Sequence, residues 1–260
     1  MLIFLHGFGG DALTTWSEFV TQWPDTHGGW DLVFFGYPTC KFKISELKLE
    51  FKLDRLYIDE HVNSFRKFIE MLEPAPAITI NKTLEVLLKC RPELRRPDDF
   101  AYSQIVLVAH SMGAVVCRRA LILEKTSDWV SKSSLILFAP AHRGGKPLMF
   151  INALTGINWG SVFAETINFV VPTLGDLKPE GKFLSDLEED TRKLVADGVE
   201  EPFIVDYVCW AIPDNVVVNK YFAEDGRKTA EEVKKKTHKE ICKPTEKWSL
   251  PLTAMRDHLP

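Results

Sequence analysis

The chain has 260 residues, of which 45% are hydrophobic and 26% charged, a balance typical of a globular protein with a sizeable buried core. Its 32 basic and 36 acidic residues give a net charge of −4, which provides no overall attraction for nucleic acid. The five cysteines lack the spacing of a zinc site or a disulfide framework, and no apolar run is long enough for a signal peptide or a transmembrane helix. We therefore expect a cytoplasmic protein without a metal site.

Short apolar runs predict the strands of a sheet. The runs at 2–5 and 31–37 are followed by glycine or proline, as buried parallel strands often are. Similar runs at 105–109, 135–139 and 203–211 predict three more strands.

Helical spacing fills most of the segments between these strands. The longest such segment, 44–72, is charged and periodic, and we expect it to be mostly helix. Further helices are expected at 82–89, 112–125, 183–195 and 250–258. This alternation predicts an α/β fold, in which a mostly parallel sheet carries helices on both faces.

Two segments break the alternation. Residues 140–200 contain apolar stretches among glycines and prolines, and we expect a cap insertion within a single domain that spans residues 1–260. Phe163 and Phe169 of this block are candidates for an acyl-binding pocket, although large apolar residues there would equally form the core of packed cap helices. Residues 223–240 are very polar, and we expect a connection there.

Ser111 lies between a predicted buried strand and a predicted helix, in the segment VLVAHSMGAVV. The pattern is close to the G-x-S-x-G nucleophile elbow, a sharp turn that exposes the serine hydroxyl and needs small residues two before and two after it. Ala109 and Gly113 meet that need. A serine here is also a favoured helix N-cap, but the strand before it and the helix after it favour a nucleophile.

A glycine-rich segment, HGFGG at 6–10, follows the first predicted strand. Glycines let the backbone approach a ligand closely, and acyl transfer needs backbone N–H groups aimed at the developing oxyanion. The N–H groups of Phe8 and Met112 are our candidates for this oxyanion hole. Neither G-x-G-x-x-G nor a Gly-Lys-Ser/Thr triplet is present, which argues against a dinucleotide or phosphate loop. His6 lies far before the serine, so we expect it to be structural.

Several motifs together resemble the α/β-hydrolase serine esterases: IFLHGFGGDALTTW, FFGYPT, VAHSMGAVV, FAPAHRG and HKEICKP. The similarity is greatest to the lipase-like group that includes the GPI inositol deacylases and the "serine active site-containing" protein. The resemblance implies the α/β-hydrolase fold, a Ser-Asp-His triad, an oxyanion hole after the first His-Gly and no cofactor. It also implies hydrolysis of a small-molecule or lipid-like carboxylic ester. A thioesterase, phospholipase, acyltransferase or non-catalytic binding protein remains an alternative.

His238 is the predicted general base. Three histidines follow the serine, and His142 comes before the last predicted strand, which is too early for this fold. His258 lies near the chain end on a predicted helix whose end should fray. His238 follows a long polar connection and resembles the catalytic-histidine loop of the family.

Asp214 is the predicted acid of the triad. It follows the predicted strand 203–211, at the sheet edge where α/β proteins place their chemistry. Asp206 falls inside that strand, and Asp225 lies in a polar Asp-Gly turn that explains it more simply.

Overall fold

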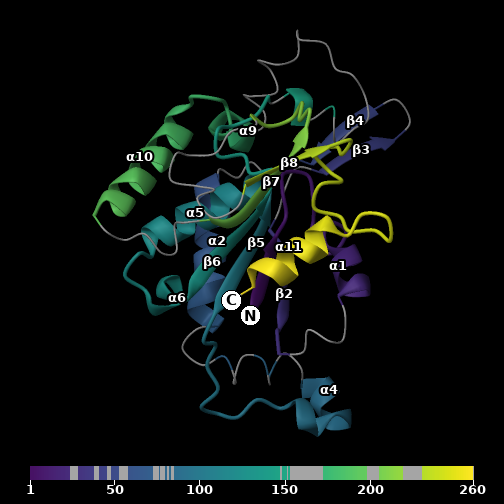
Figure 1. Ribbon diagram of the computed structural model, residues 1–260, viewed down its shortest axis with the longest axis vertical. Helices are drawn as coiled ribbons and strands as arrows, with labels where there is room; N and C mark the ends of the chain where they lie inside the picture. Colours follow the sequence, from purple (N-terminus) through teal and green to yellow (C-terminus); the bar gives the residue numbers. More distant parts are fainter. Residues whose placement is uncertain are drawn as a thin grey trace.

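Six parallel strands, in the order β2-β1-β5-β6-β7-β8, form the centre of the protein (Figure 1). They are β1 (Leu2–Leu5), β2 (Leu32–Phe35), β5 (Ile105–His110), β6 (Ser133–Phe138), β7 (Val205–Ile212) and β8 (Ala230–Lys234). This computed structural model describes residues 1–23, 29–37, 41–45, 48–52, 58–72, 76, 80, 82, 85–146, 148–150, 152, 172–197, 205–218 and 230–259.

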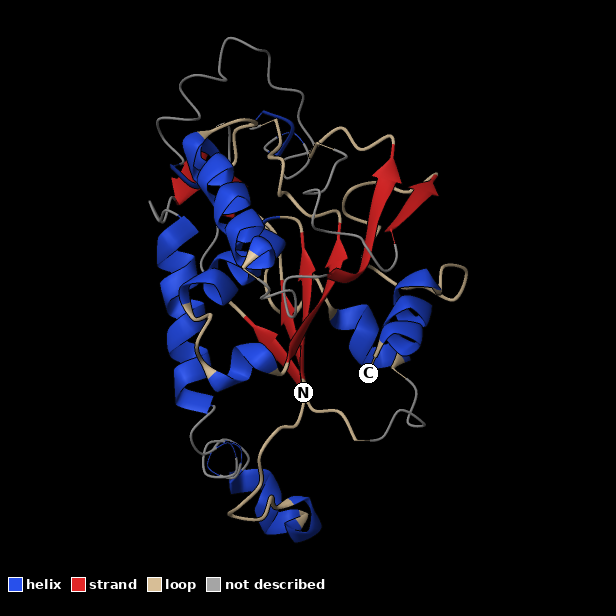
Figure 2. Ribbon diagram, turned by 60° about the vertical axis from the view of Figure 1, so that its left-hand side comes forward, coloured by secondary structure: helices blue, strands red, loops and turns tan. Residues whose placement is uncertain are grey.

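Helices cover both faces of the sheet (Figure 2). One face carries α2 (Ile58–Leu72), α5 (Met112–Leu123), α6 (Asp128–Ser131) and α10 (Lys182–Ala196). The other face carries α1 (Ser17–Gln22) and α11 (Leu250–His258). Three short helices complete the described part: α4 (Glu85–Cys90), the 3-10 helix Pro92–Leu94, and α9 (Pro172–Asp176). No helix in the described ranges is long and apolar enough to cross a membrane.

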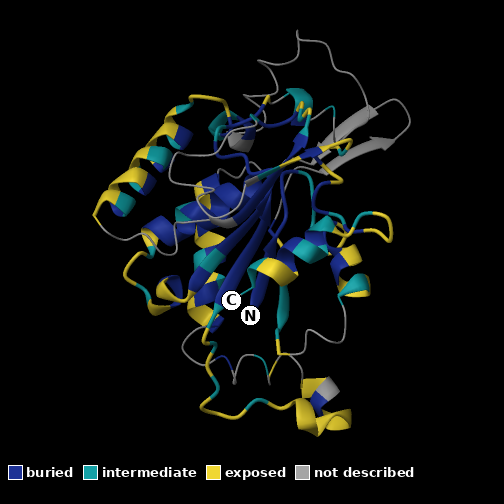
Figure 3. Ribbon diagram, in the orientation of Figure 1, coloured by how far each residue is buried: buried dark blue, intermediate teal, exposed yellow. Residues whose placement is uncertain are grey.

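Aromatic side chains that alternate along the strands build a core on each face. Phe4 of β1 packs against Trp16 and Phe19, with ring centroids 5.3 and 5.4 Å apart. Phe35 of β2 lies on the opposite face and contacts Phe65 of α2 at 5.1 Å. Burying each such ring contributes on the order of 1.5–3 kcal/mol. The central strands β1, β5 and β6 are accordingly almost entirely buried, whereas β2 and β8 at the ends of the sheet are partly exposed, and α4 at the lower end of the molecule is mostly exposed (Figure 3).

The predicted fold class is confirmed, because the sheet is parallel and has helices on both faces. The prediction of mostly helix over 44–72 was wrong in its first part. The segments β3 (Lys41–Ser45) and β4 (Lys48–Lys52) are antiparallel partners, and α2 begins only at Ile58. Their sequences, KFKIS and KLEFK, alternate charged or polar with apolar residues at a period of two, which favours strands.

The polar segment 223–240, which we expected to be a connection, contains strand β8. Its sequence, AEEVK, has few apolar residues because β8 is the last strand in the order and pairs only with β7. Edge strands are commonly charged, which discourages pairing with other chains.

Replacing Gly113 with alanine is expected to destabilise the protein. A Cβ at Gly113 would lie 2.6 Å from the carbonyl oxygen of Leu5 and 2.7 Å from that of His6, and both are backbone atoms beside α5. We expect the free energy of unfolding in urea to fall by about 2–3 kcal/mol. Gly36→Ala is the control, because its Cβ would meet only the Ala12 side chain, at 3.2 Å. Equal losses in the two variants would contradict this account of the packing.

Candidate active site

The residues singled out in the sequence meet at one edge of the sheet. Ser111 follows β5, Asp214 follows β7 and His238 follows β8, while the glycine loop (residues 7–10) follows β1. In a parallel sheet the carboxyl ends of all strands lie at the same edge, so four distant segments come together there (Figure 1).

Ser111 occupies a strained turn between β5 and α5. Its backbone angles, φ 55° and ψ −119°, belong to a region that residues with a side chain rarely adopt. Its N–H donates to the carbonyl oxygen of Phe138 at 3.0 Å, which ties the turn to β6. A Cβ on Gly7 would lie 2.8 Å from the Cβ of Ser111. The glycine loop therefore packs so closely against the turn that no side chain fits at position 7.

The serine hydroxyl does not cap the helix that follows it. Within the described residues, the side chain of Ser111 makes no capping hydrogen bond to α5. Its Oγ lies 3.0 Å from Nε2 of His238 instead. This contact is the first link of a row of three side chains.

The second link joins His238 to Asp214, with 2.9 Å between Nδ1 and Oδ2. The Asp214 side chain is fully buried, and its other oxygen, Oδ1, accepts hydrogen bonds from the N–H groups of Val216 and Val217 at 2.9 and 3.1 Å. Every carboxylate oxygen of Asp214 therefore has a partner, as a buried charge requires.

These contacts determine the charge of Asp214 and the orientation of His238. Burial alone would raise the pKa of Asp214, but the hydrogen bond and charge of His238 and the two backbone N–H groups outweigh burial and lower that pKa below its usual value. Asp214 is thus a carboxylate at neutral pH and can only accept. His238 must then carry its proton on Nδ1, which leaves Nε2 as an acceptor for the Ser111 hydroxyl.

His110, the residue before the serine, fixes the backbone of the histidine loop. Its Nε2 lies 2.8 Å from the carbonyl oxygen of His238, and because a carbonyl only accepts, Nε2 carries the proton. Burial, with a smaller contribution from the charge of His238, lowers the pKa of His110 to about 3. The ring is therefore neutral at neutral pH. The sequence signal for His110 is a polar residue at the end of an otherwise apolar strand.

The two oxyanion-hole candidates border the same site. Met112 is the first residue of α5, so its N–H is one of those that a helix leaves without a partner in its own backbone. Phe8 follows Gly7, which lies against Ser111. Among the hydrogen bonds of the described ranges, none is donated by the backbone N–H of Phe8 or Met112.

Three further histidines, His6, His142 and His258, have other partners. His6 Nδ1 lies 2.9 Å from the carbonyl oxygen of Gly7, and its ring stacks on Tyr37 at 4.2 Å, which agrees with a structural role. His142 is buried, with Nε2 3.3 Å from the carbonyl oxygen of Ala114 in α5. His258 contacts the ring of Tyr207 on α11's side of the sheet, at 5.1 Å.

Phe150, within the predicted cap segment 140–200, is one of its described residues. Its ring is buried and lies 6.1 Å from that of His238 and 6.0 Å from that of Phe8. The candidates Phe163 and Phe169 lie outside the described residues, as does Asp225. The rival acid Asp206 lies within β7, near its start.

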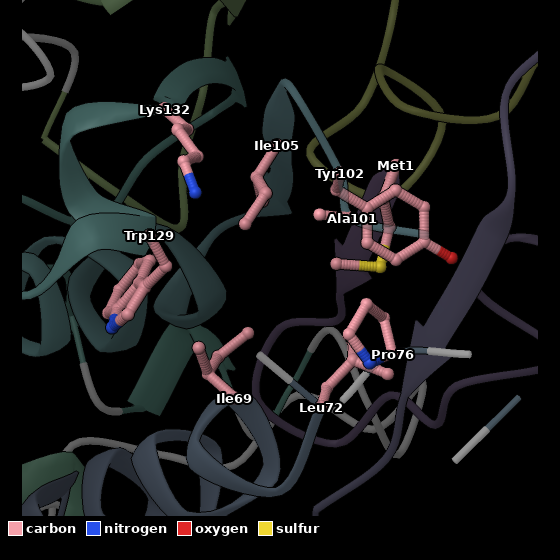
Figure 4. Close-up of a pocket in the computed structure, with 9 residues that line it drawn as sticks. All are labelled: Met1, Ile69, Leu72, Pro76, Ala101, Tyr102, Ile105, Trp129 and Lys132. Atoms are coloured by element: carbon pink, nitrogen blue, oxygen red, sulfur yellow. The ribbon is translucent and has the colours of Figure 1, made fainter. Parts of the chain in front are cut away.

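A hollow of about 820 Å³ opens beside His238. Its lining combines the apolar residues Ile212, Pro213 and Val216 with Lys239 and the lysines at 234–236. A cavity of about 30 Å³ lies at the opposite edge of the sheet, where Met1 precedes β1 and Ile105 begins β5 (Figure 4). Ser111 follows the other end of β5, so this small cavity is not part of the site.

Comparisons with known proteins identify the fold. No protein-family model matches the sequence, and no curated protein matches it. A lipase from Bacillus licheniformis in its propeptide form has a TM-score of 0.55 at 12% identity, over 100% of this chain and 50% of that one. An extracellular α/β-hydrolase from a Paenibacillus species has a TM-score of 0.51 at 10% identity, over 100% and 99% of the two chains.

A phospholipase from Legionella pneumophila is 16% identical over 81% of this chain, with a TM-score of 0.47. The present chain spans only 38% of the length of that phospholipase. The likeness to the lipase and the Paenibacillus hydrolase, together with the parallel sheet and its two helix layers, establishes that this protein has the α/β-hydrolase fold.

His110→Gln is expected to make the stability less dependent on pH. The pKa of folded His110, about 3, lies below the ordinary histidine value of 6.5, so between these values the unfolded chain binds a proton that the folded chain does not. This contribution makes the free energy of unfolding fall as the pH is lowered from 6.5 towards 3, by at most about 1.4 kcal/mol per pH unit. Urea unfolding at several pH values should give a shallower dependence for the variant. Parallel curves for the two proteins would show that His110 titrates normally.

Proposed function

We propose that this protein hydrolyses carboxylic esters through a covalent acyl-enzyme on Ser111. The observation that carries the proposal is the row of Ser111, His238 and Asp214, joined by contacts of 3.0 and 2.9 Å at the carboxyl edge of the sheet. A serine, a base within hydrogen-bond reach and a buried carboxylate that orients the base are the parts that nucleophilic acyl transfer needs.

In this mechanism Ser111 Oγ attacks the ester carbonyl carbon while His238 Nε2 takes the hydroxyl proton. The carbonyl oxygen becomes an oxyanion, which the N–H groups of Phe8 and Met112 stabilise. The carboxylate of Asp214 stabilises the imidazolium of His238, which then gives its proton to the oxygen of the departing alcohol. Water, activated by the same histidine, attacks the acyl-enzyme and releases the acid.

The surroundings of the row support an ester as the substrate. The lipase and the extracellular hydrolase with the same fold support a hydrolase of ester substrates, and the motifs that resemble the GPI inositol deacylase group point to a lipid-like or small-molecule ester. The hollow beside His238 has apolar lining residues that would contact the hydrocarbon part of such an ester. We assign Phe163 and Phe169, in a cap spanning about 140–200 of one catalytic domain, to the acyl pocket.

Ser111→Ala should abolish the activity while leaving the protein folded. We expect the kcat for p-nitrophenyl butyrate to fall on the order of 10⁴-fold or more, and labelling by a fluorophosphonate probe to disappear. Ser131→Ala is the matched control, because Ser131 is an exposed serine on α6. A folded Ser111→Ala protein that keeps a tenth of the wild-type turnover would refute the assignment.

Substitutions of the other two members test the base and the acid. His238→Ala should be nearly inactive, and His258→Ala close to wild type. Asp214→Asn should lose about 10⁴-fold in kcat at neutral pH, because an amide N–H in place of the carboxylate favours the wrong tautomer of His238. Steady-state kinetics of the three folded variants provide the measurement. An inactive His258→Ala beside an active His238→Ala would overturn the choice of base, and a fully active Asp214→Asn that of the acid.

A further inference from the structure

A second hollow, of about 230 Å³, lies on the oxyanion side of the site. The backbone of the glycine loop forms one wall, and Thr14, Thr15 and His110 contribute others. Lys239 and Lys243 also line it. The hollow is therefore lined both by Phe8, the oxyanion-hole candidate in the glycine loop, and by two cationic side chains.

The two lysines lie close enough for their charges to act on each other. Partial burial, together with the charge of Lys243, lowers the pKa of Lys239. The Nζ of Lys243 lies 3.2 Å from the carbonyl oxygen of Thr14, which holds that ammonium group at the rim of the hollow. Two like charges at one small hollow repel each other, and an anion placed between them would relieve that repulsion.

Two acidic residues that neighbour the hollow in sequence, Glu240 and Asp11, have hydrogen-bond partners of their own among the described residues. Glu240 accepts from both the N–H and the hydroxyl of Thr237, at 2.9 and 2.8 Å. Asp11 accepts from the N–H groups of Leu13 and Thr14, both at 2.9 Å. The described lining of the hollow contains no acidic side chain, so its charged groups are all cations.

We propose that this hollow binds an anionic group, a carboxylate or a phosphate, carried by the alcohol portion of the ester substrate. The proposal rests on the ester hydrolysis proposed above. Lys239 directly follows His238, the residue that protonates the departing alcohol, and it lines both this hollow and the larger one beside the histidine. The alcohol portion is therefore the part of the substrate that lies within reach of the two lysines.

A matched pair of esters tests the proposal. 4-Acetoxybenzoate carries a carboxylate on its alcohol portion, and 4-acetoxybenzamide is its neutral counterpart. The measured quantity is the ratio of kcat/KM for the anionic ester to that for the neutral one, which cancels any loss common to both. We expect this ratio to fall about threefold to fivefold in Lys239→Gln and in Lys243→Gln, and further in the double variant, as for a partly exposed charge pair.

Lys247→Gln is the control, because Lys247 is an exposed lysine on the same carboxyl-terminal segment and does not line the hollow. We expect its ratio to equal that of the wild type. Raising the salt concentration should lower the ratio of the wild type more than that of the double variant, in which only the lysines at 234–236 of the neighbouring hollow remain to be screened. A double variant whose ratio stays within twofold of the wild type would overturn the proposal.

A binding measurement separates this proposal from the proposed function. If the wild type hydrolyses neither ester and a fluorophosphonate does not label Ser111, ester hydrolysis is refuted. The hollow is then tested by calorimetric titration with 4-hydroxybenzoate and 4-hydroxybenzamide. Binding of the anion alone that is lost in the Lys239→Gln, Lys243→Gln protein supports the anion site. Equal binding of the two compounds, or binding of neither, overturns it.

Discussion

The site depends on the strained turn at Ser111, which can form only because the residues packed around it are small. Ser111 takes backbone angles that cost free energy, and the packing around it must over-determine them. Gly7 lies against the serine itself, and Gly113 lies against the carbonyl oxygens at the end of β1. Ala109, fully buried two residues before the serine, supplies the remaining small position. Elements β1, β5, β6 and α5 together maintain this strain, so Ser111 lies in a deeply buried part of the described structure.

The parallel sheet places His238 and Asp214 beside the turn at Ser111. The strand order brings the loop after β8 to Ser111 from 127 residues away along the chain. Burial of Asp214 is tolerated because both of its oxygens are hydrogen-bonded, and the resulting charge fixes the proton position on His238. One buried carboxylate thus orients the whole row, while the lysines beside the glycine loop add charge only at its outer rim.

Much of this arrangement was predictable from local patterns. Continuous apolar runs marked the central strands, and the small residues around Ser111 marked the turn. The prediction of His238 over His258 rested on the frayed end expected for the last helix and on the resemblance of the His238 segment to the family's catalytic-histidine loop. Periodicity failed in two places for physical reasons. The period-two pattern of β3 and β4 is short and was grouped with the equally charged helix α2 that follows it, and the edge strand β8 has little apolar surface to reveal it. The hollow with Lys239 and Lys243 was beyond sequence reasoning, because its walls come from segments more than 200 residues apart.

The hydrogen bond from His110 to the carbonyl oxygen of His238 has an evolutionary consequence. It attaches the loop that carries His238 to the residue next to Ser111, across 128 positions of sequence. Asp214 attaches the same histidine through its side chain. His238 is thus held through both its backbone and its side chain. Its position relative to Ser111 and Asp214 therefore does not depend on the length of the chain before strand β8. Insertions and deletions between residues 218 and 230, before strand β8, should therefore accumulate among descendants of this protein without misaligning Ser111, His238 and Asp214, and that stretch is where new specificity can be added with the least disturbance of the site.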